Sequence, residues 1–555
     1  MVPKLKRVVS YITGLIIAIT SIFVIVDTPV YAYSIPSSLR VGLSVIEDAY
    51  DLSSDSGFTY GYYSGSTYTS LETIAKSVSI YIRKDANFYN GTNLPTLYTS
   101  DSQVPSGKNK YGSHRVQIGS TYTSYSSAKS AAGTYTTKFG VNCYPTYNGS
   151  AWAVYTGDYT TSSESSSCIT TLKGKDSSLT YTAKTQQTTA LVIQDKNYKT
   201  LLFFVPGSFK FTAKPSTATI PLLKLGTKYY RGYLEFRRFT GRDITVINTV
   251  GFDEYLYGVL PSEVSASWNL AEVFKAQAVT ARNFAYVNYQ SSSHSSYDFN
   301  VCSTSDCQNY GGYSVEKAVT NSAVDATKGQ LLLYNNTPAS IYYSSSNGGY
   351  TEGTENVWSA TLAYYKTLPD QYDPKAYLLY TMTAAEASAT LKAKGHDVGN
   401  LKSIEIKKRS ASGRVLEMVV TGSTGSKTIT KASTRGAFGL RNQMFNVRTD
   451  TVYTMVEGTL SDSIMGYLNG SKYGTAFMTA KTYTMEVIPS GGIKNFNNYY
   501  YEKVTINSQS DKIYFDVYGN GHGVGMSQLG AKKMAELGKT YKEIMNFYYP
   551  GTVIG

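Results

Sequence analysis

Apolar residues in the first 250 positions recur mainly in short, strand-like runs. An alternation with a period of two places one face of a strand against a core and the other in solvent. The runs, separated by turn-forming residues, lie at 39–46, 190–194, 200–206, 229–239 and 244–250. We therefore predict a β-rich region over 33–110 that resumes after residue 180.

From residue 252 onward the apolar residues change to helical spacing. Four segments show it: 252–262, 269–289, 313–328 and 527–537. Pro261 is expected to break the first helix. Asn269, with Glu272 three residues later, is expected to cap the second, and Gly329 to stop the third. The runs LLLY and ASIYYSSS are expected to pair as strands across Asn335–Asn336, which gives an α+β fold class overall.

Residues 112–172 form a unit of different character. Their order is a strand (HRVQIGST), a Ser-rich helix, two strands joined at Asn148–Gly149, and a second helix (SSESSSCITTLKG). Asn-Gly is a favoured pair in two-residue hairpin turns. The pattern predicts two β-α units in tandem, inserted within or just ahead of the sheet that follows.

The N-terminus indicates export. Three basic residues among the first seven precede an apolar run over 8–26, and a small-residue cleavage pattern ends at Ala32. This predicts a signal peptide over 1–32. Because the apolar run approaches spanning length, an uncleaved N-terminal membrane tether is the alternative. We expect a secreted or cell-envelope protein, extracytoplasmic in either case, and no nucleic-acid partner.

Composition adds two hints. The 555 residues carry a net charge of +13 and include 52 Tyr. A basic surface attracts polyanions. The flat faces of tyrosine rings are suited to stacking on sugar rings. Most of the tyrosines are nevertheless expected to occupy ordinary positions in strands. On composition alone, a structural or adhesive surface protein would fit equally well.

Four cysteines form two candidate pairs, Cys143 with Cys168 and Cys302 with Cys307. An even count in an exported chain favours disulfides. Two cysteines alone cannot complete a tetrahedral zinc site, and the spacing of His294 upstream is unremarkable. We therefore predict two disulfides and no cofactor, with zinc as the disfavoured alternative.

The most specific pattern is the run GNGHGVGMSQLGA over 519–531, between a strand-like and a helix-like segment. Its alternating glycines suit a tight turn that presents one imidazole, His522, and no phosphate-loop spacing is present. Two further motifs precede it: EYLYGVLPSEV with KAQAVTAR over 254–282, and SSSNGGYTE over 344–352. In this order the motifs resemble those of the SpoIID/LytB family, the stage II sporulation protein D and amidase-modifier proteins of bacterial cell walls. Asn347 stands where many relatives carry Ser or Gly.

The resemblance implies a catalytic domain over 180–555, of which 33–110 is the N-terminal part, with a glycan-binding cleft where the motifs meet. The implied catalytic residue is Glu263. The implied substrate-binding residues are Lys275, Arg282, Ser344, Ser346, Gly348, Gly349, Thr351, His522, Ser527 and Gln528. In some relatives the segment corresponding to 302–307 contains a histidine and is linked to zinc. Here Asp306 falls at that position.

Glu263 lies between a helix end and Trp268, a partly desolvated setting that raises the pKa of a carboxyl and suits a general acid. Hydrolysing glycosidases usually need two carboxylates, and the nearest second candidates, Asp370 and Asp373, have no comparable context. A lytic transglycosylase needs one, because the 6-hydroxyl of N-acetylmuramic acid (MurNAc) attacks C1.

The resemblance thus implies a peptidoglycan lytic transglycosylase that cuts denuded glycan strands between MurNAc and N-acetylglucosamine (GlcNAc), leaving 1,6-anhydroMurNAc. The alternative is a non-catalytic, wall-binding modulator of an N-acetylmuramoyl-L-alanine amidase. In the 112–172 unit, RVQIG at 115–119 and WAVYTGDY at 152–159 resemble SPOR domains, which bind glycan strands stripped of stem peptides. That similarity implies a second glycan-binding unit.

Overall fold

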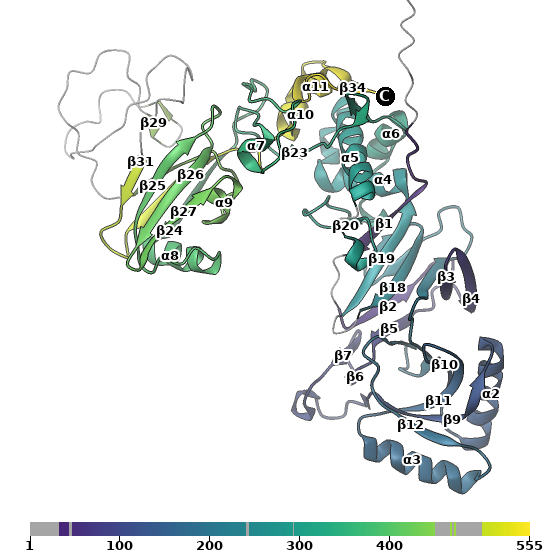
Figure 1. Ribbon diagram of the computed structural model, residues 1–555. Coiled ribbons are helices and arrows are strands. Elements are labelled where there is room, and N and C mark those ends of the chain that lie inside the picture. The colour runs from purple at the N-terminus through teal and green to yellow at the C-terminus, as the bar shows by residue number, and fades with distance from the viewer. Residues whose placement is uncertain are drawn as a thin grey trace, which may run out of the picture. The chain divides into compact units, whose positions relative to one another are not determined.

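The computed structural model describes residues 33–43, 47–239, 243–291, 294–449, 467–468, 471–472 and 502–555. The predicted signal peptide lies outside the described residues. No described helix is long and apolar enough to cross a membrane. The described residues between Pro36 and Ile554 form a mixture of helices and strands, in agreement with the predicted α+β class (Figure 1).

A seven-stranded sheet supports the first helices of the predicted catalytic domain. Its order is β20 (Val301–Cys302), β1 (Ser38–Leu43), β19 (Ile244–Gly251), β18 (Tyr233–Arg238), β15 (Lys210–Pro215), β3 (Phe58–Ser64) and β4 (Thr67–Ile74). β1 pairs with β19 over its whole length, and Gly251 leads directly into α4 (Phe252–Glu263). The N-terminal β region therefore belongs to the same sheet as the strand that delivers α4.

A ten-stranded sheet joins two parts of the chain. Its order is β12 (Tyr181–Lys184), β9 (His114–Tyr122), β11 (Trp152–Tyr159), β10 (Cys143–Tyr147), β14 (Thr200–Phe204), β13 (Leu191–Gln194), β5 (Ile80–Lys84), β2 (Ala49–Ser53), β16 (Leu223–Leu225) and β17 (Lys228–Tyr230). β5 and β13 are antiparallel neighbours, with Lys84 opposite Leu191. Residues 85–190 are therefore an insertion whose ends lie side by side, a position where insertions are tolerated.

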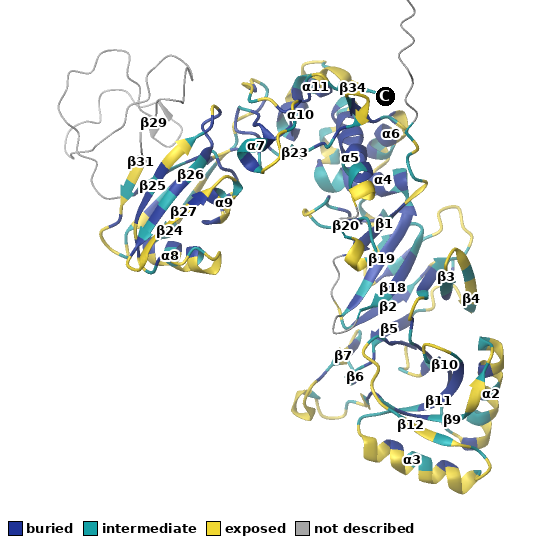
Figure 2. Cartoon of the chain, in the orientation of Figure 1, coloured by how far each residue is buried: buried dark blue, intermediate teal, exposed yellow. Residues whose placement is uncertain are grey.

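Within this insertion, a small sheet of β7 (Pro95–Leu97), β6 (Phe88–Asn90) and β8 (Lys110–Tyr111), with the 3₁₀ turn η1 (Asp101–Gln103), precedes a β-α-β-β-α-β unit. In the latter, α2 (Tyr125–Phe139) and α3 (Ser162–Lys175) pack on β9–β12, with much of their surface exposed (Figure 2). The predicted order of elements is confirmed. The unit extends past residue 172, because β12 pairs with β9.

The helical core surrounds α5 (Ala271–Ser291), which is buried along most of its length. Around it lie α4, α6 (Ala318–Ala326), α10 (Gln528–Glu536) and α11 (Tyr541–Tyr548). Short strands complete the region: β21 (Leu332–Tyr334) with β22 (Thr337–Pro338) and β34 (Val553–Ile554), and β23 (Tyr343–Ser344) with β33 (Met526–Ser527). Asn335 and Asn336 have φ of 48° and 59°, as a tight hairpin requires, which confirms that turn.

Three helix boundaries differ from the predictions. α4 continues through Pro261 to Glu263, and the Val264 N–H donates to the Leu260 carbonyl (2.9 Å). Asn269 does not cap α5: it is left-handed (φ 49°) and ends the 3₁₀ turn η2 (Ala266–Trp268). The helix predicted over 313–328 is divided into η4 (Tyr313–Val315) and α6, because Lys317 is extended.

Residues 377–518 form a unit that the sequence reasoning did not separate; we call it the C-terminal insertion. One sheet contains β24 (Tyr377–Thr383), β32 (Lys512–Tyr518) and β28 (Phe445–Thr449), and the other β27 (Gly425–Thr430), β26 (Val415–Gly422), β25 (Leu401–Arg409) and β31 (Glu502–Thr505). With α8 (Ala384–Ala393) and α9 (Ala432–Gly436) these strands enclose their own core; β29 (Tyr467–Leu468) and β30 (Ser471–Lys472) pair with each other. The Gly519 N–H donates to the Ala376 carbonyl (2.6 Å), so the chain leaves and re-enters at one place.

Candidate active site

A cleft of about 690 Å³ brings together segments that lie far apart in the sequence. Its wall consists of Glu263, Phe284, Ser305, Asp306, Cys307, Asn309, Tyr342, Tyr343, Ser344, Ser345, Trp358, Arg435, Arg441, Asn520, Gly521, His522 and Gln528. Four predicted site residues, Glu263, Ser344, His522 and Gln528, are among them. The motif-bearing segments therefore do converge on one cleft.

Glu263 is the last residue of α4, and its carboxylate Oε1 accepts a hydrogen bond from the Asn309 N–H (2.7 Å). Burial raises the pKa of Glu263 above its ordinary value. The opposing effects come only from neutral donors, the backbone and side chain of Asn309 and the side chain of Gln528. The direction expected from the sequence is confirmed, and a carboxyl of this kind holds its proton to higher pH than a surface glutamate does.

His522 is held in the glycine-rich loop by its own neighbours. Its Nδ1 accepts the Val524 N–H (3.0 Å), and its ring lies 5.0 Å from that of Trp358. Burial, followed by repulsion from Arg435 and Arg414, lowers the pKa of His522 to about 3. The imidazole is therefore neutral at physiological pH and carries its proton on Nε2.

The glycines of this loop permit close backbone approach. A Cβ on Gly525 (φ 73°) would lie 2.1 Å from the Tyr342 carbonyl oxygen, and one on Gly523 (φ 74°) 1.9 Å from Arg414. Only glycine fits such positions. The loop is thus the tight, side-chain-poor wall that the sequence predicts.

Five predicted substrate-binding residues do not line the cleft: Ser346, Gly348, Gly349, Thr351 and Ser527. The hydroxyls of Ser346 (2.8 Å) and Ser527 (2.6 Å) donate to the buried carboxylate of Asp373. Thr351 donates to the Lys366 carbonyl (2.6 Å). The polar atoms of these three side chains hold the motif segments together, and the assignment of all five residues to substrate stays a prediction.

The two glycines serve the same turn. Gly348 and Gly349 have φ of 75° and 95°, and a Cβ on Gly348 would lie 3.0 Å from the Tyr518 carbonyl oxygen. Asp370 also lies behind the turn and accepts hydrogen bonds from Asn347 Nδ2 (2.7 Å) and the Tyr548 hydroxyl (2.8 Å). Neither Asp370 nor Asp373 borders the cleft.

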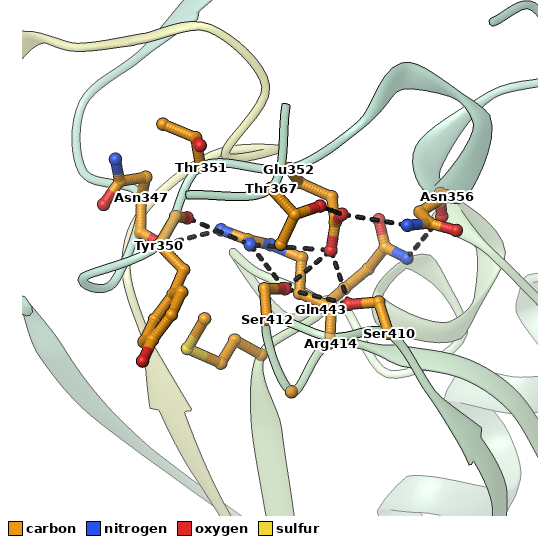
Figure 3. Close-up of polar contacts among 12 residues, drawn as sticks. Asn347, Tyr350, Thr351, Glu352, Asn356, Thr367, Ser410, Ser412, Arg414 and Gln443 are labelled. Carbon is orange, nitrogen blue, oxygen red and sulfur yellow. Dashed lines mark hydrogen bonds and ion pairs between the residues drawn. The ribbon is translucent and has the colours of Figure 1, made fainter. Parts of the chain in front are cut away.

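Figure 3 shows a buried ionic network that the sequence reasoning missed. The carboxylate of Glu352 accepts hydrogen bonds from Ser412 (2.6 Å), Asn356 (2.9 Å) and Thr367 (2.7 Å), and lies 3.8 Å from Arg414. Burial would raise the pKa of Glu352, but Arg414 and the hydroxyl donors outweigh it and lower that pKa. Arg414 also donates to the Asn347 carbonyl (2.6 Å). The network fixes the C-terminal insertion to the motif segment 344–352.

The two cations predicted on one face of α5 are not cleft residues either. Arg282 is fully buried; it donates to Asp253 (3.3 Å) and to the Val324 carbonyl (3.2 Å), which joins α5 to α4 and α6. Lys275 pairs with Glu272 (2.7 Å) and faces the ring of Tyr541. Arg282 thus joins three helices and Lys275 is partly exposed, and their assignment to substrate stays a prediction.

The cysteines are free thiols in the structure, and their two predicted disulfides stay predictions. At one rim of the cleft, His294 Nε2 lies 3.1 Å from Cys307 Sγ, and ligand atoms of His294, Cys302, Asp306 and Cys307 all lie within 4.8 Å of one another. Folding thus places His294 and Asp306 beside the two cysteines, which the sequence spacing did not indicate, and the expectation of no cofactor stays a prediction. Two thiolates, an imidazole and a carboxylate fit a closed tetrahedral zinc site.

A family model described as stage II sporulation protein (SpoIID) matches residues 240–334. The chain is 31% identical over 319 residues to the amidase enhancer of Bacillus subtilis strain 168, an alignment that covers 54% of this chain and 40% of that protein. The resemblance to the SpoIID/LytB family is confirmed.

Two further relatives extend the comparison. Stage II sporulation protein D of the same Bacillus strain is 28% identical over 332 residues, 56% of this chain and 75% of that protein. An uncharacterised protein of Brachyspira hyodysenteriae is 28% identical over 329 residues, 59% and 73% of the two lengths. The chain spans less than half of the amidase enhancer. Glu263 lies inside the SpoIID match, whereas Trp358, Arg435, Arg441 and His522 lie beyond it.

Proposed function

We propose that this SpoIID-like protein is a peptidoglycan lytic transglycosylase acting on denuded glycan strands outside the cytoplasm. The observation that carries the proposal is Glu263, a carboxyl with a raised pKa in a cleft of about 690 Å³. The one other carboxylate among the described residues of the wall is Asp306, which belongs to the cysteine cluster. A single acid of this kind suits the transglycosylase better than a two-carboxylate hydrolase.

The chemistry needs two proton transfers, one from Glu263 and one back to it. The Glu263 carboxyl donates its proton to the glycosidic oxygen as the bond between MurNAc C1 and that oxygen breaks. The carboxylate then accepts the proton of the MurNAc 6-hydroxyl as its oxygen bonds to C1. The products are a free 4-hydroxyl on GlcNAc and a 1,6-anhydro ring, and Glu263 regains its proton.

Part of the cleft wall is aromatic. Trp358 and Tyr342 lie with ring centroids 4.7 Å apart, and both line the cleft with Tyr343. Flat apolar rings with a polar edge are suited to stacking on sugar rings. The β-α-β-β-α-β unit over 114–184 would add a second glycan contact in the same chain, raising the local concentration of strands by tethering.

A zinc ion would be held by His294, Cys302, Asp306 and Cys307 at the rim, where it would stabilise the segment that presents Asn309 to Glu263. We assign it no step in the reaction. Residues 302–309 would thus provide three of the four metal ligands as well as a hydrogen bond to the acid.

A non-catalytic amidase modulator is the second candidate, favoured by the similarity to a protein named amidase enhancer. Mass spectrometry of denuded glycan after incubation with the protein separates the two. Products that are one water lighter than hydrolysis products support the transglycosylase. Free reducing ends indicate a hydrolase, and uncut glycan together with stimulation of an added N-acetylmuramoyl-L-alanine amidase indicates the modulator.

A further inference from the structure

Two arginines of the C-terminal insertion reach the cleft. Arg435 lies in α9 and Arg441 in the loop that follows, and both line the wall together with Glu263 and His522. The Arg441 carbonyl accepts hydrogen bonds from Arg435 Nη1 (3.0 Å) and from the Gly521 N–H (3.0 Å). This shared acceptor fixes both arginines to the loop that carries His522.

Neither guanidinium has a carboxylate partner among the residues that the structure describes. The neighbouring Arg414, by contrast, pairs with Glu352 and donates to two carbonyls. Arg435 is half-buried, and its desolvation lowers its pKa. It also lies close enough to His522 to contribute to the lowered pKa of that imidazole. A desolvated cation without a counter-charge is unfavourable, so a cleft built with one is suited to an anion.

We propose that Arg435 and Arg441 form a carboxylate-binding subsite that recognises the free lactyl carboxylate of MurNAc. The proposal rests on the proposed action on glycan strands. In peptide-bearing glycan this group is an amide, neutral and bulky, and GlcNAc lacks it altogether. A guanidinium binds a carboxylate through two parallel, charge-assisted hydrogen bonds. The two arginines would thereby distinguish denuded strands from substituted ones.

The subsite also places the protein in a reaction order. A free lactyl carboxylate is produced by hydrolysis of the amide bond between MurNAc and the stem peptide. An amidase reaction must therefore supply the preferred ligand of this cleft. The discrimination comes from the C-terminal insertion, whereas the acid comes from α4.

Binding to the full chain carrying Glu263→Gln, which prevents turnover, tests the subsite. The ligands are a denuded GlcNAc–MurNAc tetrasaccharide, the same compound with its lactyl carboxyls blocked as methylamides, and chitotetraose. We expect the carboxylate form to bind about tenfold more tightly than the methylamide, equivalent to ~1.4 kcal/mol. Arg441→Gln and Arg435→Gln should each reduce this preference several-fold while chitotetraose binding stays unchanged.

Lys427→Gln is the matched control, because Lys427 is an exposed cation of the same insertion outside the cleft wall. It should keep the full preference. If Arg435→Gln fails to fold, Arg441→Gln, at an exposed position, carries the test alone. Retention of the preference in a folded Arg441→Gln protein, or no preference in the parent, overturns the subsite. Failure of the wild type to cleave the tetrasaccharide, with the preference intact, overturns the transglycosylase and leaves the subsite standing.

Discussion

Glu263→Gln is the perturbation that tests the proposed chemistry most directly. The glutamine keeps a carbonyl oxygen that can accept the Asn309 N–H, which lies 2.7 Å from the carboxylate in the wild type. It cannot donate a proton to a glycosidic oxygen. Because general acid–base catalysis typically contributes roughly 10²–10⁴-fold, the variant should lose about 3–5 kcal/mol of transition-state stabilisation. Glycan affinity should stay near that of the wild type.

The same substitution should change stability with a definite sign. Burial raises the pKa of Glu263 in the folded state, so the folded protein holds this proton over a pH range where the unfolded chain, with its ordinary pKa near 4.5, has released it. Stability from this group is fully present below the unfolded pKa and is lost as pH rises through the folded one. Glu263→Gln should equal the wild type near pH 4 and exceed it by about 1 kcal/mol at neutral pH.

Glu272→Gln is the matched control, an equivalent change at the start of α5 and outside the cleft wall. Desolvation raises the pKa of Glu272, but hydrogen bonds from Lys275 and from the Tyr541 N–H outweigh it and lower that pKa. Its contribution to stability is present above the unfolded pKa and is lost as pH falls. The control should cleave glycan normally and be slightly less stable at pH 7.

The assay is release of anhydro products from denuded glycan, measured beside urea unfolding at pH 4 and pH 7. Wild-type turnover in Glu263→Gln would remove this residue from the mechanism. Equal stability of the variant and the wild type at both pH values would contradict the inferred burial cost at Glu263. Loss of turnover with unchanged glycan binding is the expected combination.

Three further predictions concern Arg282, the cysteine cluster and the β-α-β-β-α-β unit. Arg282→Met should lower unfolding stability by ~3 kcal/mol, because it leaves Asp253 without its buried partner; an altered KM at unchanged stability would restore Arg282 to the substrate site. Protein purified with zinc should hold about one ion per chain by elemental analysis, lost in Cys307→Ser and kept in Cys143→Ser; thiol titration showing Cys302 and Cys307 oxidised would favour the disulfide instead. A variant lacking residues 112–184 should sediment less with amidase-treated sacculi but cleave short, saturating glycan normally, whereas equal sedimentation would make the unit structural.

The sequence predicted the elements of the active site well, because their signals are local. The glycine spacing around His522 predicts a tight turn such as the one observed, and Glu263 is half-buried at a helix end, as its neighbours indicate. The β-α-β-β-α-β order followed from short-range alternation and the Asn148–Gly149 turn. Where a boundary was wrong, as at residue 172, the missing strand was defined by a distant partner, β9.

The roles of the motif side chains were harder to predict, because they depend on contacts across long sequence separations. Ser346 and Ser527 share a carboxylate acceptor, Asp373, although 181 residues separate them in the numbering of the chain. Glu352 has its partners Ser412 and Arg414 in the C-terminal insertion, about 60 positions further along the chain. In a single sequence, a motif residue that holds the backbone in place cannot be distinguished from one that contacts substrate.

In the proposed function, the arrangement of the cleft separates catalysis from selectivity. The acid is carried by α4 and held by Asn309, and both residues lie within the SpoIID match over 240–334. Arg435 and Arg441, which have no carboxylate partner among the described residues, come from the C-terminal insertion. This unit has its own core and is fixed to the motif segment through Glu352 and Arg414. A change within that insertion can therefore alter which glycan charge is recognised while the geometry of the acid is preserved. Exchange of residues 377–518 between relatives should transfer the carboxylate preference without transferring the rate of bond cleavage, and a coupled transfer of both properties would contradict this division.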